Sequence, residues 1–211
     1  MGTKTAPSPI AKLDLYQIYK AEYVTPREPL LLRVAKATYL GIAGRGAPGA
    51  DAFQQAIGAL YSVAFTIKMA SRFAGRDYGV SKLEGLFWAD SGACFAAEPK
   101  DQWSWRLLIR TPDFIGKREL AAARRTLSEK GKGPLFKQVE LTPLNEKLCV
   151  QAVHLGPYDR APETARRMEA VAAEQGYRLD GLHHEIYLSD PRRAAPEKLR
   201  TILRIPVSPK P

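Results

Sequence analysis

Hydrophobic and polar residues alternate along the chain with the periods of strands and helices. The run ATYLGIAGRGAPG at residues 37–49 predicts a strand that enters a glycine-rich turn. A helix is expected from about Asp51, which is expected to act as its N-cap. Two strands are predicted next, from LEGLFWA at 83–89 and WSWRLLIRT at 103–111. The residues that recur at helical spacing after Asp51 are Phe53, Ile57, Leu60, Tyr61, Ala64 and Lys68.

The second half of the chain repeats this order about 110 residues later. LCVQAVHLGPYD predicts a strand and a turn, and PETARRMEAVAAEQG predicts a helix with Pro162 near its start and Gly176 just past its end. LHHEIYLS and LRTILRIPV predict two further strands. A helix over 117–130 links the halves and ends at Gly131. The order of elements, more than sequence identity, therefore indicates an internal duplication.

Two strand–helix–strand–strand units favour an α+β fold with one antiparallel sheet. We expect helices on one face of this sheet and a ligand groove on the other. An N-terminal extension is expected over 1–32, followed by a single domain over 33–207. Within that domain, two pseudo-symmetric modules at about 33–115 and 146–207 are joined by the linker helix region.

The strand HHEIY contains a charged residue, Glu185, at a position where a core-facing charge would be costly. Side chains alternate along a strand, so Ile186 and Leu188 are expected to meet the helices, whereas His183, Glu185 and Tyr187 point the other way. Glu185 is then a carboxylate of the groove. The alternative is that Glu185 pairs with an arginine at a sheet edge.

Composition restricts the class of protein. With 45% hydrophobic residues in 211, the chain is expected to fold around a real core. No apolar run approaches the ~20 residues of a membrane span, and the N-terminal residues lack a signal-peptide core. Cys94 and Cys149 have no metal-ligand spacing around them. We therefore expect a reduced, cytoplasmic protein with no membrane partner.

The formal net charge of +10 allows contact with nucleic acid. Much of this charge lies in GKRELAAARRTLSEKGKG and in the tail from Arg192. The first segment is amphipathic, with Leu120, Ala123 and Leu127 expected to face inward. Because no zinc finger or RNA-binding signature accompanies it, we favour a solvated basic surface and expect no specific nucleic-acid partner.

Several motifs together resemble the GyrI-like small-molecule-binding family. They are GPYD after a strand, the helix that follows, HHEIYLSDPRR and PEKLRTILRIPV. EYVTP, FQQAIGALYSVAFTIKM, LEGLFW and WSWRLLIRTPDF are similar to its free-standing bacterial members, so the resemblance covers roughly residues 12 to 207. It implies two pseudo-symmetric modules with a groove between them. In the wider family the glutamate of the EIYL strand lies in that groove and meets cationic aromatic drugs, and the resemblance implies this position for Glu185.

The resemblance also implies what the groove does. Some free-standing members are similar to cofactor-free hydrolases that open the cyclopropane ring of duocarmycin- and yatakemycin-type genotoxins, a detoxification or self-resistance activity. The alternative is a non-catalytic module that sequesters or senses drugs. Inhibition of a partner such as DNA gyrase by protein contact is also allowed by the family. No metal or other cofactor is expected. The expected partner is a hydrophobic aromatic small molecule, and the chain is expected to be a monomer or a weak homo-oligomer.

Hydrolysis of an activated cyclopropane requires a flat apolar slot, a carboxylate that activates water and a donor near the developing phenolate. Glu185 is the first candidate for the base, with Glu84 on the corresponding strand of the first half, and Tyr187 is the candidate donor. Desolvation among aromatic rings is expected to raise the pKa of Glu185. The expected ligand-binding residues are Trp88, Trp105, Tyr61, Phe65 and His154.

Each of these residues has a structural alternative. Glu84 begins an element and could be exposed. Trp105 shares a strand face with Trp103, and one of them could belong to the core. A core position also competes for Tyr61 on its helix, and His154 before the GPYD turn is more often structural. His183 and His184 point in opposite directions, which makes them poor partners for a metal ion.

Overall fold

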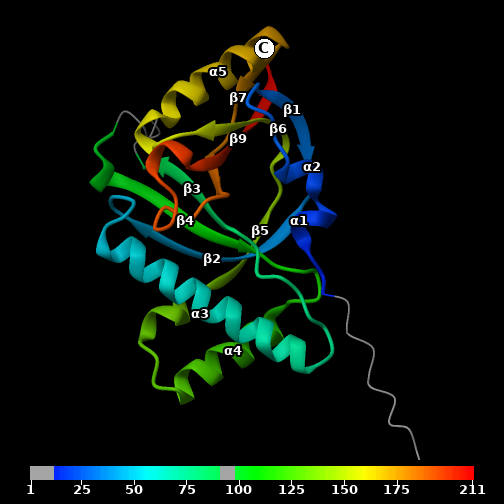
Figure 1. Ribbon diagram of the computed structural model, residues 1–211, viewed down its shortest axis with the longest axis vertical. Helices are drawn as coiled ribbons and strands as arrows, with labels where there is room; N and C mark the ends of the chain where they lie inside the picture. The colour runs from blue at the N-terminus through cyan, green and yellow to red at the C-terminus, as the bar shows by residue number, and fades with distance from the viewer. Residues whose placement is uncertain (1–11, 91–97) are drawn as a thin grey trace, which may run out of the picture.

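The computed structural model describes residues 12–90 and 98–211, so that Cys94 lies outside the described residues. The strands form one sheet in the order β1-β6-β9-β8-β3-β4-β2-β5, with β7 paired to β9, and all these pairs are antiparallel (Figure 1). The strands are β1 (Leu30–Val34), β2 (Ala37–Arg45), β3 (Leu83–Ala89), β4 (Trp103–Arg110), β5 (Glu140–Leu144), β6 (Lys147–Leu155), β7 (Tyr177–Leu179), β8 (His183–Tyr187) and β9 (Arg200–Pro209).

The helices are two short N-terminal ones and three longer ones. α3 begins with Asp51 in its first turn, but Ala50 occupies the N-cap position, so the expected cap by Asp51 is wrong. Asp51 instead places a negative charge near the helix N-terminus, where the helix dipole favours it. α5 has Pro162 in its first turn and Gly176 beyond its end at φ +83°, as the sequence indicates. The helices are α1 (Leu15–Ile18), α2 (Lys20–Tyr23), α3 (Asp51–Phe73), α4 (Lys117–Glu129) and α5 (Ala161–Glu174).

The strand order is symmetric about the β8–β3 pair. β6 then corresponds to β2, β9 to β4 and β1 to β5, as expected of two similar units. In each half a helix follows the first long strand, α3 after β2 and α5 after β6. β1 precedes the first unit but pairs with β6 of the second, while β5 precedes the second unit but pairs with β2 of the first. The two halves therefore exchange their edge strands.

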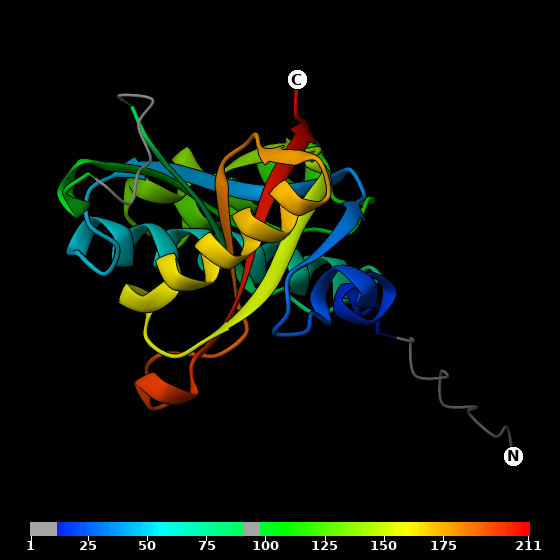
Figure 2. The same ribbon diagram turned by 90° about the horizontal axis from the view of Figure 1, so that it is seen from above.

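α3 and α5 cover the same face of the sheet. Phe87 of β3 packs into the core beneath α3 and pairs with His183 of β8. Glu185, two residues further along β8, pairs with Leu203, which belongs to the cluster beneath α5. Directly paired residues of neighbouring strands point to the same face. Figure 2, seen from above, shows α5 (yellow) in front and α3 (cyan) behind it, and Figure 1 shows the two helices well apart.

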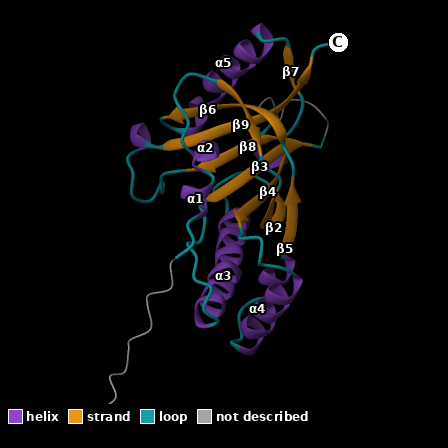
Figure 3. Ribbon diagram, turned by 90° about the vertical axis from the view of Figure 1, so that its right-hand side faces the viewer, coloured by secondary structure: helices purple, strands orange, loops and turns teal. Residues whose placement is uncertain are grey.

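The opposite face is covered by the N-terminal segment. Tyr23 of α2 forms a buried cluster with Ile186 and Ile202, and Tyr16 and Leu188 pack against it. Figure 3 shows the short helices α1 and α2 in front of the sheet. The expectation that Ile186 and Leu188 meet the main helices is wrong, because these residues point to the opposite face and pack against α1 and α2. The α+β class with one antiparallel sheet is confirmed, whereas the groove expected on the face opposite the main helices lies, as described next, on the same face as α3 and α5. No helix in residues 12–90 or 98–211 is long and apolar enough to cross a membrane.

Candidate functional site

A pocket of about 1440 Å³ lies between α3 and α5 above strands β3 and β8. Its walls are mainly aromatic and aliphatic. Tyr61 and Phe65 of α3 stack with ring centroids 5.9 Å apart and form part of one wall. Other aromatic residues in the lining are Phe53, Phe87, Trp88, Trp103, Tyr158 and Tyr187. Sheet twist opens the two helices away from each other, and a large apolar concavity remains between them.

Glu185 is the charged group at the floor of this pocket. Its side chain is 13% exposed and lies 3.1 Å from His183, measured between Oε1 and Nε2. Tyr187, on the same face of β8, forms a hydrogen bond with the same carboxylate. The ring of Tyr158 packs edge-on against Tyr187 at 5.8 Å. The floor therefore holds a carboxylate with two polar partners among aromatic rings.

Two opposing effects set the pKa of Glu185. Burial of the carboxyl group raises it, but the hydrogen bond and positive potential of His183 and the hydrogen bond from Tyr187 lower it more. The pKa therefore lies below its ordinary value, and the expectation of a raised pKa is wrong. Sequence reasoning considered the desolvation but not the two partners. For Tyr187, burial and the nearby Glu185 raise the phenol pKa well above 10, so its hydroxyl stays protonated and can donate.

Gly85 is the residue of β3 that pairs directly with Glu185. A Cβ atom at this position would lie 2.9 Å from the Phe87 ring and 3.4 Å from the hydroxyl of Tyr187. Phe87 is only 2% exposed and cannot easily move away. The absence of a side chain at Gly85 therefore provides the room that Phe87 and Tyr187 occupy in the pocket floor.

Gly85→Ala is expected to destabilise the fold by about 1–3 kcal/mol, the usual cost of adding a methyl group to a packed core. It should also weaken the binding of a planar aromatic dye, because Phe87 and Tyr187 must shift. Chemical unfolding and fluorescence titration measure the two effects. Gly58→Ala, where a Cβ would meet nothing within 4 Å in the middle of α3, is the matched control and should leave stability equal or higher. Equal stability of both variants would contradict the tight packing around Gly85.

Of the other predicted ligand-binding residues, Tyr61 and Phe65 line the pocket, whereas two do not point into it. Trp105 is 2% exposed and packs edge-on against Phe53 at 5.1 Å in the core under α3, so its role as a pocket wall is wrong. Trp103, two residues earlier, occupies the wall instead. Trp88 borders the pocket, but it pairs with Ser104 on the opposite face and its indole N–H donates to Asp90 at 3.0 Å.

His154, near the end of β6, is a structural residue that contacts the turn before α5 and α5 itself. Its Nε2 donates to the carbonyl oxygen of Pro157 at 3.0 Å, and its Nδ1 accepts from the hydroxyl of Thr164 at 2.9 Å. These two bonds use both ring nitrogens and join β6 to α5. His154 does not line the large pocket but a smaller cavity of about 340 Å³, so its assignment as a ligand-binding residue of the groove is also corrected.

Glu84 lies on the opposite face from Glu185, although the two residues are on neighbouring strands. Its register partner is Ile186, one position along from the Gly85–Glu185 pair, and a shift of one residue reverses the face. Glu84 is completely buried and accepts a hydrogen bond from the Tyr23 hydroxyl at 3.1 Å. It cannot act as a base in the pocket, so the expectation of a catalytic Glu84 is wrong.

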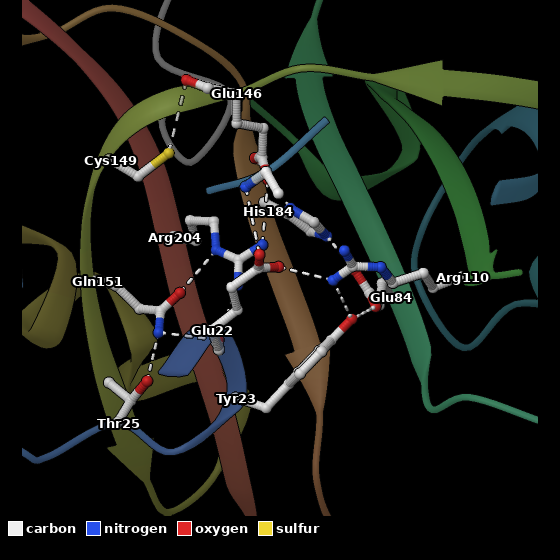
Figure 4. Close-up of polar contacts among 11 residues, drawn as sticks. Glu22, Tyr23, Thr25, Glu84, Arg110, Glu146, Cys149, Gln151, His184 and Arg204 are labelled. Carbon is white, nitrogen blue, oxygen red and sulfur yellow. Dashed lines mark hydrogen bonds and ion pairs between the residues drawn. The ribbon is translucent and has the colours of Figure 1, made fainter. Parts of the chain in front are cut away.

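Glu84 instead belongs to a buried polar network between the sheet and α2 (Figure 4). His184 lies at its centre, with Nδ1 2.9 Å from Glu146 and Nε2 2.9 Å from Glu84. Arg204 contacts the other oxygen of Glu146 at 3.1 Å, and Arg110 contacts Glu22 of α2 at 2.6 Å. Burial lowers the pKa of His184, but Glu146 and Glu84 raise it more, to about 9, so we expect a protonated histidine and two arginines to balance the formal charges of three carboxylates.

Network members also hold the N-terminal segment in place. Arg204 donates to the backbone carbonyl of Glu22 at 2.8 Å and to the side chain of Gln151 at 2.6 Å. The amide of Gln151 in turn donates to Thr25 and to the carbonyl of Glu22. Residues from both halves and from α2 therefore share one set of contacts, which sequence reasoning did not identify.

Tyr158 and His183 are two residues beside Glu185 and Tyr187 in the pocket that were not predicted as site residues. Tyr158 belongs to the GPYD motif and lines the pocket beside Tyr187. His183 lies on the same strand face as Glu185, as the alternation of side chains predicts, but no role in the site was predicted for it. Asp190 lies at the rim of the pocket and accepts hydrogen bonds from Arg192, the shortest of which is 2.8 Å. These bonds lower the pKa of Asp190 to about 2. The motif and the strand period were the available signals for both missed residues.

The fold has counterparts in known structures. An uncharacterized conserved protein from Listeria innocua is 36% identical, with a TM-score of 0.87, over 93% of this chain and all of that one. A hydrolase from Listeria innocua is 35% identical, with a TM-score of 0.84, over the same shares of the two chains. The C-terminal domain of EcmrR, at 13% identity and a TM-score of 0.56 over 86% of this chain and 98% of that one, shares the fold. No protein with a curated description matches the chain.

The family comparison covers most of the sequence. The model of the GyrI-like small molecule binding domain matches residues 28–208, a range that contains β1 to β8, all of β9 except its last residue, and the helices α3, α4 and α5. The matched range also contains the residues that surround the pocket between α3 and α5. This chain therefore belongs to the family of GyrI-like small-molecule-binding domains.

Proposed function

We propose that the protein binds planar, hydrophobic aromatic molecules between α3 and α5 and hydrolyses an activated cyclopropane ring in DNA-alkylating genotoxins. The observation that carries this proposal is the arrangement of Glu185 and Tyr187 on the floor of an aromatic pocket of about 1440 Å³. The similar hydrolase from Listeria innocua supports a catalytic role. The reaction would serve detoxification or self-resistance.

The reaction needs only water as a second reactant. The water oxygen attacks the exposed ring carbon, the carbon–carbon bond of the cyclopropane breaks, and its electron pair moves through the dienone to the carbonyl oxygen. Glu185, being ionised, accepts a hydrogen bond from the water and takes its proton as the new carbon–oxygen bond forms. Tyr187 donates toward the oxygen that becomes a phenolate. Proton transfer from Glu185 to the phenolate or to solvent restores the site.

His183 would support the base through its bond to Glu185. A carboxylate with a lowered pKa is a weaker proton acceptor in solution, so the rate would depend mainly on its position and on the apolar walls that exclude other water. The hydrogen bonds that lower the pKa also fix the carboxylate in place. Preorganisation would therefore compensate for reduced basicity.

The decisive experiment is incubation of the protein with a cyclopropane-containing alkylator, followed by chromatographic detection of the water adduct. Formation of more than one equivalent of adduct per protein molecule supports an enzyme. Binding with no adduct above the uncatalysed rate would refute hydrolysis and leave a binding protein.

The ionised Glu185 favours a second candidate function, binding of aromatic cations without turnover. Because the pKa of this carboxyl group lies below its ordinary value of about 4.5, its charge should persist through mildly acidic pH. The affinity for a permanently charged planar dye such as ethidium is therefore expected to stay constant from neutral pH down to about pH 5. It should decrease only as the pH falls below about 4.5, where the carboxylate becomes protonated.

Fluorescence titration of the dye across this range measures the effect, with an uncharged planar dye of similar size as control. The control should show no loss of affinity that parallels the protonation of Glu185. A loss of cation affinity already near pH 6 would contradict the lowered pKa and indicate that desolvation dominates at this carboxyl group.

A further inference from the structure

A row of exposed apolar side chains extends along α3 beyond the pocket. Phe65, Met69 and Phe73 follow one another at four-residue spacing and are 52%, 40% and 84% exposed. Tyr61 stacks on Phe65 and connects the row to the pocket wall. Figure 3 shows α3 and α4 projecting past the sheet. Large apolar residues at successive turns of one helix face are typical of an interaction surface.

Small residues lie beside this row at the same spacing, namely Gly58, Ser62, Thr66 and Ala70. Ser62 donates its hydroxyl to the carbonyl oxygen of Gly58 at 2.8 Å, and Thr66 donates to that of Ser62 at 2.7 Å. Both hydroxyl protons are therefore used within the helix, and these side chains present mainly hydrocarbon. We call the six residues Gly58, Ser62, Phe65, Thr66, Met69 and Phe73 the α3 face.

The α3 face also carries little charge. From Gly58 to Phe73 the sequence of α3 contains two charged residues, and both contact Asp77. The side chain of Lys68 is 15% exposed and lies 3.2 Å from this carboxylate, and that of Arg72 is 59% exposed and lies 4.0 Å from it. The chain as a whole has a formal net charge of +10. A partner held by charge complementarity would have to bind elsewhere, whereas a partner with an equally uncharged surface fits this helix.

We propose that the α3 faces of two copies of this chain pack against each other in a two-fold symmetric dimer. If the two helices run antiparallel and cross between Phe65 and Thr66, each large residue meets a small one. Phe73 then lies against Gly58, Met69 against Ser62, and Phe65 against Thr66. A two-fold interface requires such self-complementarity, because each contact occurs twice with the copies interchanged.

The available area fits a weak dimer. An aromatic side chain buries about 150–250 Å² when completely covered, so the exposed parts of Phe65, Met69 and Phe73 offer roughly 300 Å² per copy. A standard stable interface buries about 800 Å² per partner. The small residues of the α3 face add to this area but leave the interface at the lower end of the range. Association should therefore be concentration-dependent and, since like charges repel, stronger at high ionic strength.

The dimer would also extend the pocket. Gly58 and Phe65 belong both to the α3 face and to the pocket lining. With the proposed pairing, Phe73 of the partner subunit would lie beside Gly58 at the pocket rim. Each copy would then contribute an aromatic ring to the ligand site of the other.

Sedimentation equilibrium at a series of concentrations tests the proposal. The wild-type chain should dimerise, and Met69→Lys should raise the dissociation constant at least tenfold. Val24→Lys is the matched control, because Val24 is 52% exposed at the end of α2, away from α3, and it should dimerise like the wild type. A wild-type chain that stays monomeric at all concentrations, or a dimer that Met69→Lys leaves intact, would overturn the proposal.

The pairing of large with small residues has its own test. A Cβ at Gly58 meets nothing within 4 Å, so Gly58→Leu should fold normally as a monomer while clashing with Phe73 of the partner subunit. Combining it with Phe73→Ala should restore dimerisation, which loss of folding could not explain. Dimerisation of Gly58→Leu alone would refute this packing. Binding to anionic lipid vesicles by a monomer, lost in Phe73→Ala, would instead assign the α3 face to a membrane surface and reject the dimer.

Discussion

Glu185→Gln is expected to lower the turnover of an activated cyclopropane by about a hundredfold or more, the usual contribution of a general base. Glutamine keeps the size of the side chain and most of its hydrogen-bonding capacity, but it cannot accept the proton of the attacking water. His183 and Tyr187 then lose a charged partner, while the aromatic walls remain. Binding of an uncharged ligand should accordingly be largely retained.

Single-turnover kinetics and calorimetric titration separate these two effects. Glu140→Gln, an exposed carboxylate on β5 outside the pocket, is the control and should turn over like the wild type. Glu84→Gln should lose stability without losing turnover per folded molecule, because Glu84 lies on the other face of the sheet. If Glu84→Gln abolishes turnover in the folded protein and Glu185→Gln does not, the proposed role of Glu185 is wrong.

His184→Gln is expected to lower the free energy of unfolding below pH 6.5 by about 3 kcal/mol, the value of a pKa difference of this size. Burial lowers the pKa of His184, but Glu146 and Glu84 raise it more, to about 9 from an ordinary value of 6.5. The folded state therefore binds the proton more tightly than the unfolded state. This stabilisation is completely present below pH 6.5 and is lost as the pH rises through about 9.

Urea unfolding at a series of pH values measures this loss. The wild type should become progressively less stable between pH 6.5 and about 9, whereas His184→Gln should lack this decrease. His183→Gln is the matched control, since it changes the adjacent histidine on the opposite face and leaves the network untouched. A wild type whose stability is constant across this range would show that His184 is not protonated in the folded protein.

Much of the fold could be predicted from the sequence because its elements are strongly periodic. The strand LEGLFWA, the helix beginning at Asp51 and the second-half helix with Pro162 and Gly176 are all found close to their predicted bounds. The short strands β1 and β5 were not predicted. Each has five residues, and only pairing with the other half of the chain defines it. Local periodicity contains no information on such long-range pairing.

The site was predictable only as far as strand alternation applies. Alternation and the family resemblance together place Glu185 and Tyr187 on one face, and both line the pocket. The same reasoning could not place Glu84, because the register between β3 and β8 decides its face. Strand alternation also could not predict which of Trp103 and Trp105 lines the pocket, because the two residues share a face and differ only in how far α3 covers them. Register and coverage are properties of the assembled sheet.

The exchanged edge strands have a consequence for how the chain folds. β1 completes the sheet of the second half and β5 that of the first, so neither half alone contains a complete set of hydrogen-bonded neighbours. A half-length chain would expose the backbone of β2 or β6 as an open edge, and two such chains could satisfy each other only by swapping strands. We therefore expect the two modules to fold as one unit, and the arrangement of the strands resembles a strand-swapped dimer joined into a single polypeptide.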